Sequence, residues 1–443
     1  MNKDDIIINN TVINTQSKIY GLTGIQNLGN TCYMNSAIQA LAHNHVLMNY
    51  MFNNKNEIFK ILLKNARNIL KDSEKFQLSE VNSIPLSLKK KIQDPQYNFT
   101  MLDNNEINII LNNTITVQLI RLLEYMWKDN CIVIPTSFRV IFTEARNKFF
   151  FGNEHHDAEE AYTCIVQKIM EELAEKKNIK FRMQNEDVMS LIQFTQNMRE
   201  EILKAKDATE RDRLSKLYHT KISEMPREIL MINSYSTMKK YYGENYSHVM
   251  EMFTGFQHSS LNCPNNQCGY ISNKFDPFTH LSLPLPSNMT HIDECLQEYF
   301  KEEVLDSDNS WTCDKCKNNV RAIKKLALWT LPHILVIQLK RFNIYRQSKD
   351  NRTVNFPTDD FDLSKYISTN QLEPINNSKY KLQCIINHTG GLNHGHYFTY
   401  NLDMNMDKWY IFNDDVVAPI SHNRVITSSA YLLFYVRQDL LSS

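Results

Sequence analysis

The spacing of apolar residues predicts a helix that begins at Cys32. Asn30 and Thr31 stand just before it, and both residue types can cap the free amide groups of a first helical turn. The apolar positions that share one face of this helix are Met34, Ala37, Ile38 and Leu41. A cysteine at a helix start lies at the positive end of the helix dipole, which favours the nucleophilic thiolate form.

Further helices are predicted in the middle of the chain. One carries Asp157 in its first turn, where a negative charge complements the dipole, and its apolar face consists of Ala158, Ala161, Ile165 and Ile169. A charged stretch, residues 174–245, offers apolar positions for a helical hairpin at Met198, Ile202, Leu214 and Leu217. Residues 292–300 are predicted to form a short helix.

Strands are predicted mainly in the second half of the chain, where apolar residues alternate or form short continuous runs. These runs cover residues 278–286, 327–331, 333–342, 380–388, 409–412 and 431–437. We expect residues 327–331 and 333–342 to be buried strands of a central sheet.

A β-hairpin is predicted around the turn at residues 401–408. If Tyr400 pairs with Trp409, antiparallel pairing places His396 opposite Asn413, and a slip of one residue places it opposite Asp414. Either side chain can accept a ring N–H of the imidazole. The other ring nitrogen is then available to Cys32 as a base.

Composition limits the classes of function. The chain has 443 residues with 42% hydrophobic content, which is enough to bury a large core. Lys plus Arg and Asp plus Glu number 49 each, so no overall basic field favours nucleic acid or an anionic membrane as the partner. No apolar run is long enough to span a bilayer. Nine cysteines, an odd number, favour a reducing compartment, and we expect the cytoplasm or nucleus.

Two short cysteine pairs predict a metal site. The pairs are Cys263 with Cys268 and Cys313 with Cys316, each inside a turn rich in Asn, Pro or Asp. Four thiolates brought together by two turns suit tetrahedral Zn²⁺ and leave no open position for water, so the zinc is expected to be structural. Unpaired thiols at the surface are the alternative.

The stretch from Gly24 to Gln39, which reads GIQNLGNTCYMNSAIQ, resembles the cysteine box of the ubiquitin-specific protease family. Asn27 lies five residues before Cys32 and offers a side-chain amide that can stabilise an oxyanion. The segment from Tyr380 to Tyr397 is similar to the family's histidine box and contains His396. By this resemblance Asn413 is the third member of a catalytic triad, and Asp414 can share its role.

The helix at Asp157 is similar to a further family box, although His155 and His156 replace its two glutamines. In the family, this aspartate and the glutamate three residues later hold the basic C-terminal tail of ubiquitin. The resemblance therefore implies that Asp157 and Glu160 bind substrate, and we include Tyr397 in the same substrate-binding set. It also implies that zinc-bearing fingers cradle the globular part of ubiquitin.

The resemblance implies an α+β, papain-like fold. The expected parts are an N-terminal extension at 1–20, a catalytic domain at 21–440, a helical thumb at about 21–250, zinc-bearing fingers at about 251–325, a palm at about 326–440, and insertions at about 53–115 and 174–245. The two insertions are not covered by the resemblance, and we expect them to be surface excursions or contacts for a regulatory partner.

The implied activity is that of a thiol protease that releases ubiquitin from ubiquitinated proteins. The Cys32 thiolate attacks the carbonyl of ubiquitin's terminal glycine, His396 protonates the leaving lysine amine, and water hydrolyses the thioester. No catalytic cofactor is expected. Two alternatives remain open: a protease for another ubiquitin-like modifier, and an inactive ubiquitin-binding scaffold.

Overall fold

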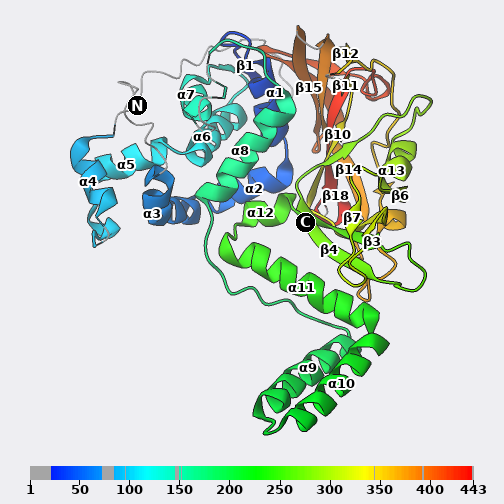
Figure 1. The fold of residues 1–443 in the computed structure, drawn as a ribbon. Coiled ribbons are helices and arrows are strands. Elements are labelled where there is room, and N and C mark those ends of the chain that lie inside the picture. Colours follow the sequence, from blue (N-terminus) through cyan, green and yellow to red (C-terminus); the bar gives the residue numbers. More distant parts are fainter. Residues whose placement is uncertain are drawn as a thin grey trace.

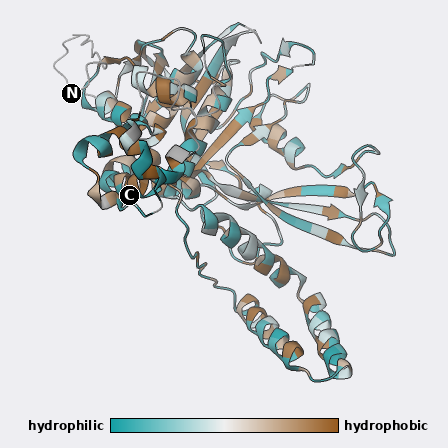
Figure 2. Cartoon of the chain, turned by 60° about the vertical axis from the view of Figure 1, so that its left-hand side comes forward, coloured by the Kyte–Doolittle hydropathy of each residue, from teal (hydrophilic) through white to brown (hydrophobic). Residues whose placement is uncertain are grey.

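The computed structural model describes residues 21–71, 84–94, 96–144, 149–150, 152–343, 345–391 and 394–441. The N-terminal extension expected at residues 1–20 lies outside these residues. Most of the helices precede most of the strands along the chain, and they form a helical layer beside a central sheet (Figure 1). Brown, apolar segments concentrate where the two layers meet (Figure 2).

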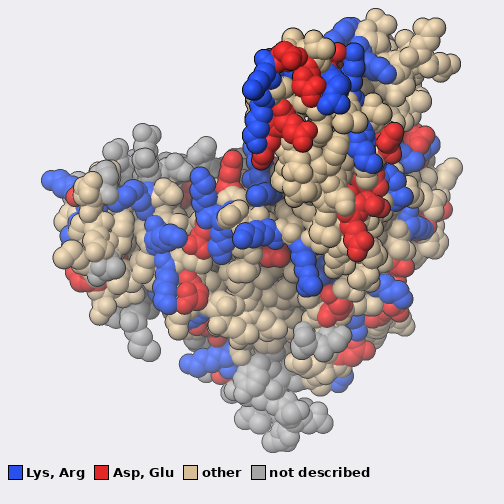
Figure 3. Space-filling model, turned by 90° about the horizontal axis from the view of Figure 1, so that it is seen from below, with Lys and Arg blue, Asp and Glu red and all other residues tan. Residues whose placement is uncertain are grey.

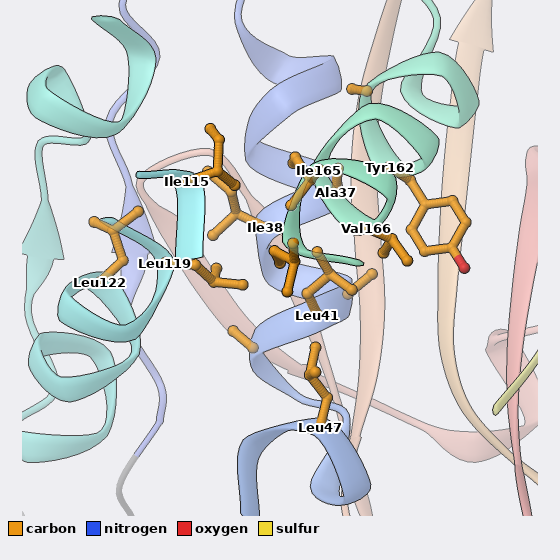
Figure 4. Close-up of a cluster of buried hydrophobic side chains, with 14 of the residues drawn as sticks. Ala37, Ile38, Leu41, Leu47, Ile115, Leu119, Leu122, Tyr162, Ile165 and Val166 are labelled. Atoms are coloured by element: carbon orange, nitrogen blue, oxygen red, sulfur yellow. The ribbon is translucent and has the colours of Figure 1, made fainter. Parts of the chain in front are cut away.

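Helix α1 (Cys32–Ala42) is the centre of the helical layer, and every one of its residues is buried. Figure 4 shows Ala37, Ile38 and Leu41 of α1 among apolar side chains of α6 and α8. The helices of this layer are α2 (His45–Asn53), α3 (Lys55–Lys71), α6 (Ile115–Lys128), α7 (Thr136–Glu144), α8 (Ala158–Glu172) and α12 (His248–Phe253). The predicted helix beginning at Cys32 is therefore confirmed. Its apolar residues are explained by its burial between the other helices and the central sheet.

The first expected insertion is helical where the structure describes it. Helices α4 (Leu86–Gln93) and α5 (Asn104–Asn112) and a 3-10 turn, η2 (Phe99–Met101), pack against α3. They share a small apolar cluster formed by Ala66, Ile84, Leu88, Ile92, Leu102 and Ile110. This cluster is separate from the main core, so α4, η2 and α5 form a helical unit on the outside of α3. Helix α3 also lies within the expected insertion, but its Ile58 and Leu62 are buried in the main core, so this part is not a surface excursion.

The second expected insertion contains α9 (Glu186–Lys204), α10 (Ala208–Glu224) and α11 (Pro226–Glu244). The predicted hairpin is α9 with α10, in which Met198 and Leu214 are buried while Leu217 is 49% exposed. The hairpin projects away from the rest of the molecule (Figures 1 and 2). Seen from below, acidic and basic side chains are interspersed among the described residues of this face (Figure 3).

The central sheet has the strand order β17, β16, β15, β14, β18, β10, β5, with β13 also paired to β14. Its strands are β5 (Leu281–Leu283), β10 (Ile334–Leu339), β13 (Phe361–Asp362), β14 (Lys379–Gly390), β15 (Gly395–Asp403), β16 (Lys408–Asn413), β17 (Val416–Ile420) and β18 (Ala430–Arg437). Neighbours are antiparallel except β10 and β5. Helix α1 packs across β15 and β14. The last strand, β18, lies inside the sheet rather than at its edge.

A second, distal sheet has the order β4, β3, β9, β6 and is antiparallel. Its strands are β3 (Gly255–Asn262), β4 (Ile271–Phe278), β6 (Glu303–Val304) and β9 (Ile323–Thr330), with α13 (Ile292–Phe300) between β5 and β6. The prediction that residues 327–331 belong to the central sheet is wrong, because residues 327–330 lie in β9 of the distal sheet and Leu331 follows that strand. Pro332 has no N–H to donate and separates the two apolar runs, which lets the chain change sheets before β10.

Three short ladders complete the described structure. They are β1 (Gly24–Ile25) with β2 (Ile132–Val133), β7 (Trp311–Thr312) with β8 (Asn319–Val320), and β11 (Phe342–Asn343) with β12 (Ser348–Lys349). No helix in the described part of the chain has the length and apolar character that a bilayer crossing requires.

Candidate active site and cysteine cluster

Cys32 is the first residue of α1, and only 3% of it is exposed. The turn before it is tight, because Gly29 and Asn30 have φ angles of +95° and +52°. The predicted capping is wrong in its detail. Thr31 precedes the helix, but its hydroxyl accepts a hydrogen bond from the Leu28 amide and does not cap the first turn. The first amide groups of α1 are therefore left without a side-chain cap, at the end of the helix that carries the thiol.

His396 lies at the start of β15, where the central sheet meets the N-terminus of α1. Its Nε2 is 2.5 Å from Oδ1 of Asn413, the last residue of β16. A hydrogen bond with Cys32 raises the pKa of His396 to about 9, with smaller contributions from Asn413 and the Asp414 charge, against burial. The structure thus brings Cys32, His396 and Asn413 together, although their sequence positions span almost the whole chain.

The hairpin register differs from the one proposed. Tyr400 pairs with Ile411, not with Trp409, because both strands continue to Asp403 and Lys408 around a shorter turn. The ladder between β15 and β16 ends at Thr399 opposite Phe412. His396 therefore reaches Asn413 beyond the end of the ladder and not as a direct cross-strand partner.

Asp414 is close to His396, but its main contacts are with asparagines near Cys32. Its Oδ2 lies 4.0 Å from Nε2 of His396. It accepts a 2.9 Å hydrogen bond from Asn27 Nδ2 and a 2.8 Å hydrogen bond from Asn35 Nδ2. The structure favours Asn413 as the direct partner of the imidazole. Asp414 instead connects the end of β16 with the residues around the thiol.

Asn27 is fixed at both ends of its side-chain amide. Oδ1 accepts hydrogen bonds from the Gly29 amide, the Thr31 amide and the Thr31 hydroxyl at 3.0 to 3.2 Å. Nδ2 donates one hydrogen to Asp414. A side-chain amide has two N–H groups, so the second N–H of Asn27 can donate a hydrogen bond to an oxyanion beside Cys32.

Gly24 allows the β16 to β17 turn to come this close. A Cβ at Gly24 would lie 2.4 Å from the carbonyl oxygen of Asp415, so only glycine fits. The neighbouring Ile25 amide donates a 2.8 Å hydrogen bond to the Asp414 carbonyl. Close approach of the two backbones is therefore the reason for glycine at this position.

Asp157 precedes α8 and is held by two donors. Its Oδ1 accepts from the Glu159 amide and its Oδ2 from the Tyr431 hydroxyl, both at 2.7 Å. Burial raises the pKa of Asp157 to about 6, although the two hydrogen bonds oppose that shift. Tyr397 is buried with its ring centroid 6.1 Å from that of Tyr431, and Glu160 is half-buried on α8. These substrate-binding candidates thus belong to the surroundings of the catalytic strand β15.

Sequence reasoning missed two residues of the site, Asn35 and Tyr431. Asn35 lies on α1 one turn after Cys32 and is 2% exposed. A polar side chain in a helix that is otherwise buried is a signal of a specific hydrogen bond, and here the partner is Asp414. Tyr431 gave no comparable signal, because it appears as one apolar position of β18.

The predicted cysteines form a cluster at the far end of the distal sheet. Cys263 and Cys268 follow β3, and Cys313 and Cys316 lie in the turn between β7 and β8. All four sulfur atoms lie within 4.8 Å of one another, with Cys263 to Cys316 at 3.9 Å and Cys268 to Cys313 at 3.6 Å. The stacked rings of Tyr270 and Trp311 border the cluster. This all-sulfur set can hold one metal ion with four protein ligands.

The sequence of this chain is similar to those of known proteins. The family model described as "Ubiquitin carboxyl-terminal hydrolase" matches residues 23–435. A probable ubiquitin carboxyl-terminal hydrolase of Acanthamoeba polyphaga mimivirus is 50% identical over 441 residues, which is 98% of this chain and 94% of the relative. Bovine ubiquitin carboxyl-terminal hydrolase 2 is 30% identical over 423 residues, which is 94% of this chain and 55% of the relative. The chain thus spans about half of that mammalian relative.

Among solved structures, the yeast SAGA DUB module that contains Ubp8 is similar in fold. In the complex described as bound to monoubiquitin, the TM-score is 0.57 at 22% sequence identity, with 97% of this chain and 72% of that chain covered. The complex described as bound to ubiquitin aldehyde has the same score and identity. The α+β, papain-like fold expected from the sequence is confirmed by this likeness.

Proposed function

This chain belongs to the ubiquitin carboxyl-terminal hydrolase family of cysteine-type deubiquitinases, and we propose that it hydrolyses the isopeptide or peptide bond after the C-terminal glycine of ubiquitin. The observation that carries the proposal is the position of His396, hydrogen-bonded to Asn413 on one side and to Cys32 on the other. The imidazole is thereby oriented as the base and acid for a sulfur nucleophile.

The reaction begins with a proton transfer from Cys32 to His396, for which the hydrogen bond between the two side chains aligns them. The thiolate attacks the glycine carbonyl, and the Asn27 side chain and the Cys32 amide stabilise the oxyanion. His396 then gives its proton to the leaving lysine amine as the thioester forms. Water, deprotonated by the same imidazole, releases ubiquitin and regenerates the thiol.

The substrate tail binds between the α8 side and the β15 side of the site. Asp157, Glu160 and Tyr397 are proposed to contact the basic C-terminal tail of ubiquitin, as the family resemblance implies. The support is their location, since Asp157 and Tyr397 both neighbour Tyr431 next to the catalytic strand. The globular part of ubiquitin is proposed to rest on the distal sheet, and a regulatory partner is proposed to bind the insertions.

We propose Zn²⁺ as the ion of the cysteine cluster and a structural role for it. The support is the closed set of four sulfur donors at the ends of two turns. No step of the reaction involves these residues. We also propose that the protein acts in the cytoplasm or nucleus, where free thiols persist, of a cell that contains ubiquitin.

The test uses ubiquitin that carries a fluorogenic amide at its C-terminus, together with probes that carry a reactive C-terminal group. We expect turnover by the native chain, none by Cys32→Ala, and labelling of Cys32 by the ubiquitin probe. If only a probe made from another ubiquitin-like modifier labels Cys32, the substrate is that modifier and not ubiquitin. Binding of ubiquitin without turnover or labelling would identify a scaffold.

A further inference from the structure

The ammonium group of Lys349 lies beside the candidate active site, where its hydrogen bonds go to main-chain oxygens and it lies 6.0 Å from the ring centroid of Phe342. Lys349 ends the β11 to β12 hairpin, where it pairs with Phe342. Its Nζ donates to the carbonyl oxygens of His388 at 2.6 Å and Gly390 at 3.4 Å. Across the described residues, no carboxylate forms an ion pair with it. A half-buried ammonium group that donates its hydrogen bonds to two carbonyl oxygens is uncommon, and its burial costs free energy.

Those carbonyls belong to the end of β14, and the end of β14 positions the catalytic histidine. Thr389 pairs with His396 and Gly390 with Gly395 in the β14 to β15 ladder. The Gly391 amide closes the connection with a 2.9 Å hydrogen bond to the His394 carbonyl. A displacement of the β14 end therefore moves the residue that donates and accepts the proton.

The side chain of His388 fills the space between the hairpin and β15. Its ring centroid lies 5.1 Å from that of Phe342 and 4.5 Å from that of Tyr397. A Cβ on Gly395 would lie 2.0 Å from Nε2 of His388, so the ring is packed directly against the backbone before His396. Burial, with Lys349, His396 and His155 adding to it, lowers the pKa of His388 to about 4, so this ring stays neutral.

We infer that Lys349 is a positioning residue for the deubiquitinating reaction: its two hydrogen bonds fix the end of β14 and thereby hold His396 against Cys32. The inference rests on the proposed function. The inference goes beyond that function because it assigns a role to the β11 to β12 hairpin, which lies near the start of β15 (Figure 1). This role is to align His396 with Cys32. Lys349 acts through the backbone of β14, because its hydrogen bonds go to the carbonyl oxygens of His388 and Gly390 and not to the thiol or the imidazole of the catalytic pair.

The first test compares Lys349→Met with Lys349→Arg. Methionine keeps the aliphatic stem but has no donor, and we expect kcat on the fluorogenic ubiquitin substrate to fall about tenfold or more with KM within about twofold. Arginine keeps the charge and several donors, so it should restore at least half of the kcat. The matched control is Lys379→Met at the other end of β14, where the ammonium is exposed and 3.7 Å from Asp360.

The second readout is the pH dependence of kcat. Burial and the neighbouring Arg341 lower the pKa of Lys349 to about 8, and His388 is a further titratable group close to its ammonium. As the pH rises through about 8, the ammonium loses its proton and its charge-assisted hydrogen bonds weaken. Lys349→Arg should therefore keep a higher fraction of its maximal kcat than the native enzyme between pH 8 and 9, below the pKa of about 9 of His396.

A third measurement separates this inference from the proposed function. The alkylation rate of Cys32 by iodoacetamide, followed by mass spectrometry of its peptide, reports the thiol and imidazole pair without ubiquitin. We expect Lys349→Met to slow it several-fold at pH 7, and Lys379→Met to leave it unchanged. Slower alkylation with no ubiquitin turnover by any variant would support the positioning and refute the function. Native alkylation and native kcat in folded Lys349→Met would refute the inference.

Discussion

Asn27 and Asp414 are 387 residues apart in the sequence and joined by a 2.9 Å hydrogen bond from Nδ2 to Oδ2. The bond connects the loop before the nucleophile with the residue after the histidine's direct partner. Because Asp414 also accepts from Asn35 on α1, one carboxylate aligns two asparagines around Cys32. It thereby orients the amide proposed to stabilise the oxyanion.

The first prediction concerns Asp414. Asp414→Ala should lower kcat about 100-fold, because Asn27 loses the acceptor that fixes its amide and one oxyanion donor becomes misaligned. KM should change little, since the effect is on the transition state. Steady-state kinetics on fluorogenic ubiquitin measure both constants. Asp415→Ala, which truncates the exposed neighbour, is the control, and an equal loss in both variants would contradict a specific role for Asp414.

Asn413 provides the second prediction. Asn413→Asp keeps an oxygen acceptor for Nε2 of His396 and should retain kcat within about tenfold of the native value. Asn413→Leu removes the acceptor and should lower kcat about 100-fold or more, because the imidazole is no longer held in one orientation. The assay is turnover of fluorogenic ubiquitin, with circular dichroism to confirm folding. A folded Asn413→Leu variant with native kcat would show that another group orients His396.

The third prediction is a pH dependence of substrate affinity. Burial raises the pKa of Asp157 to about 6, above the ordinary value near 4. As the pH falls through about 6, the folded protein takes up a proton here that the unfolded chain does not. This group therefore adds stability on acidification, while the negative charge offered to ubiquitin's tail is lost. KM should rise below about pH 6, as measured by steady-state kinetics.

The variant Tyr431→Phe tests whether protonation of Asp157 causes the rise in KM at low pH. The Tyr431 hydroxyl bonds the Asp157 carboxylate and opposes the upward shift of its pKa. Its removal should move the rise in KM to a higher pH, whereas Asp157→Asn should raise KM above about pH 6 and remove the pH dependence of KM. If KM of the native enzyme is flat from pH 5 to 8, Asp157 does not bind the tail through its charge.

The fourth prediction concerns the metal. We expect about one equivalent of zinc per purified chain by metal analysis, and less than half an equivalent in Cys313→Ser. Loss of the ion should lower the midpoint of thermal unfolding by several degrees, because the turns that carry the cysteines have little apolar core of their own. Cys164→Ser, at a buried cysteine on α8, should keep its zinc. Zinc content below half an equivalent in the folded native protein would refute the assignment.

The sequence alone determined the local features of this protein. A run of apolar residues at helical spacing after Cys32 specifies α1, and the two short cysteine pairs specify tight turns that can chelate, because both signals are contained in a few consecutive residues. Helix α13 has the predicted bounds, Ile292–Phe300. The family resemblance also named Cys32, His396 and Asn413 before the structure brought them together.

Only the tertiary structure decided how distant segments meet. The hairpin register, the sheet to which residues 323–330 belong, and the use of Asp414 by Asn27 all depend on which strand lies beside which. The sequence cannot fix these, since an apolar run suits either sheet and a shift of a hairpin pairing by two residues keeps every side chain on its face. The same is true of Lys349, whose role depends on carbonyl oxygens that carry no sequence signal. Packing of α1 against β15 and β14 supplies the missing information, because it permits one arrangement of the strands around Cys32.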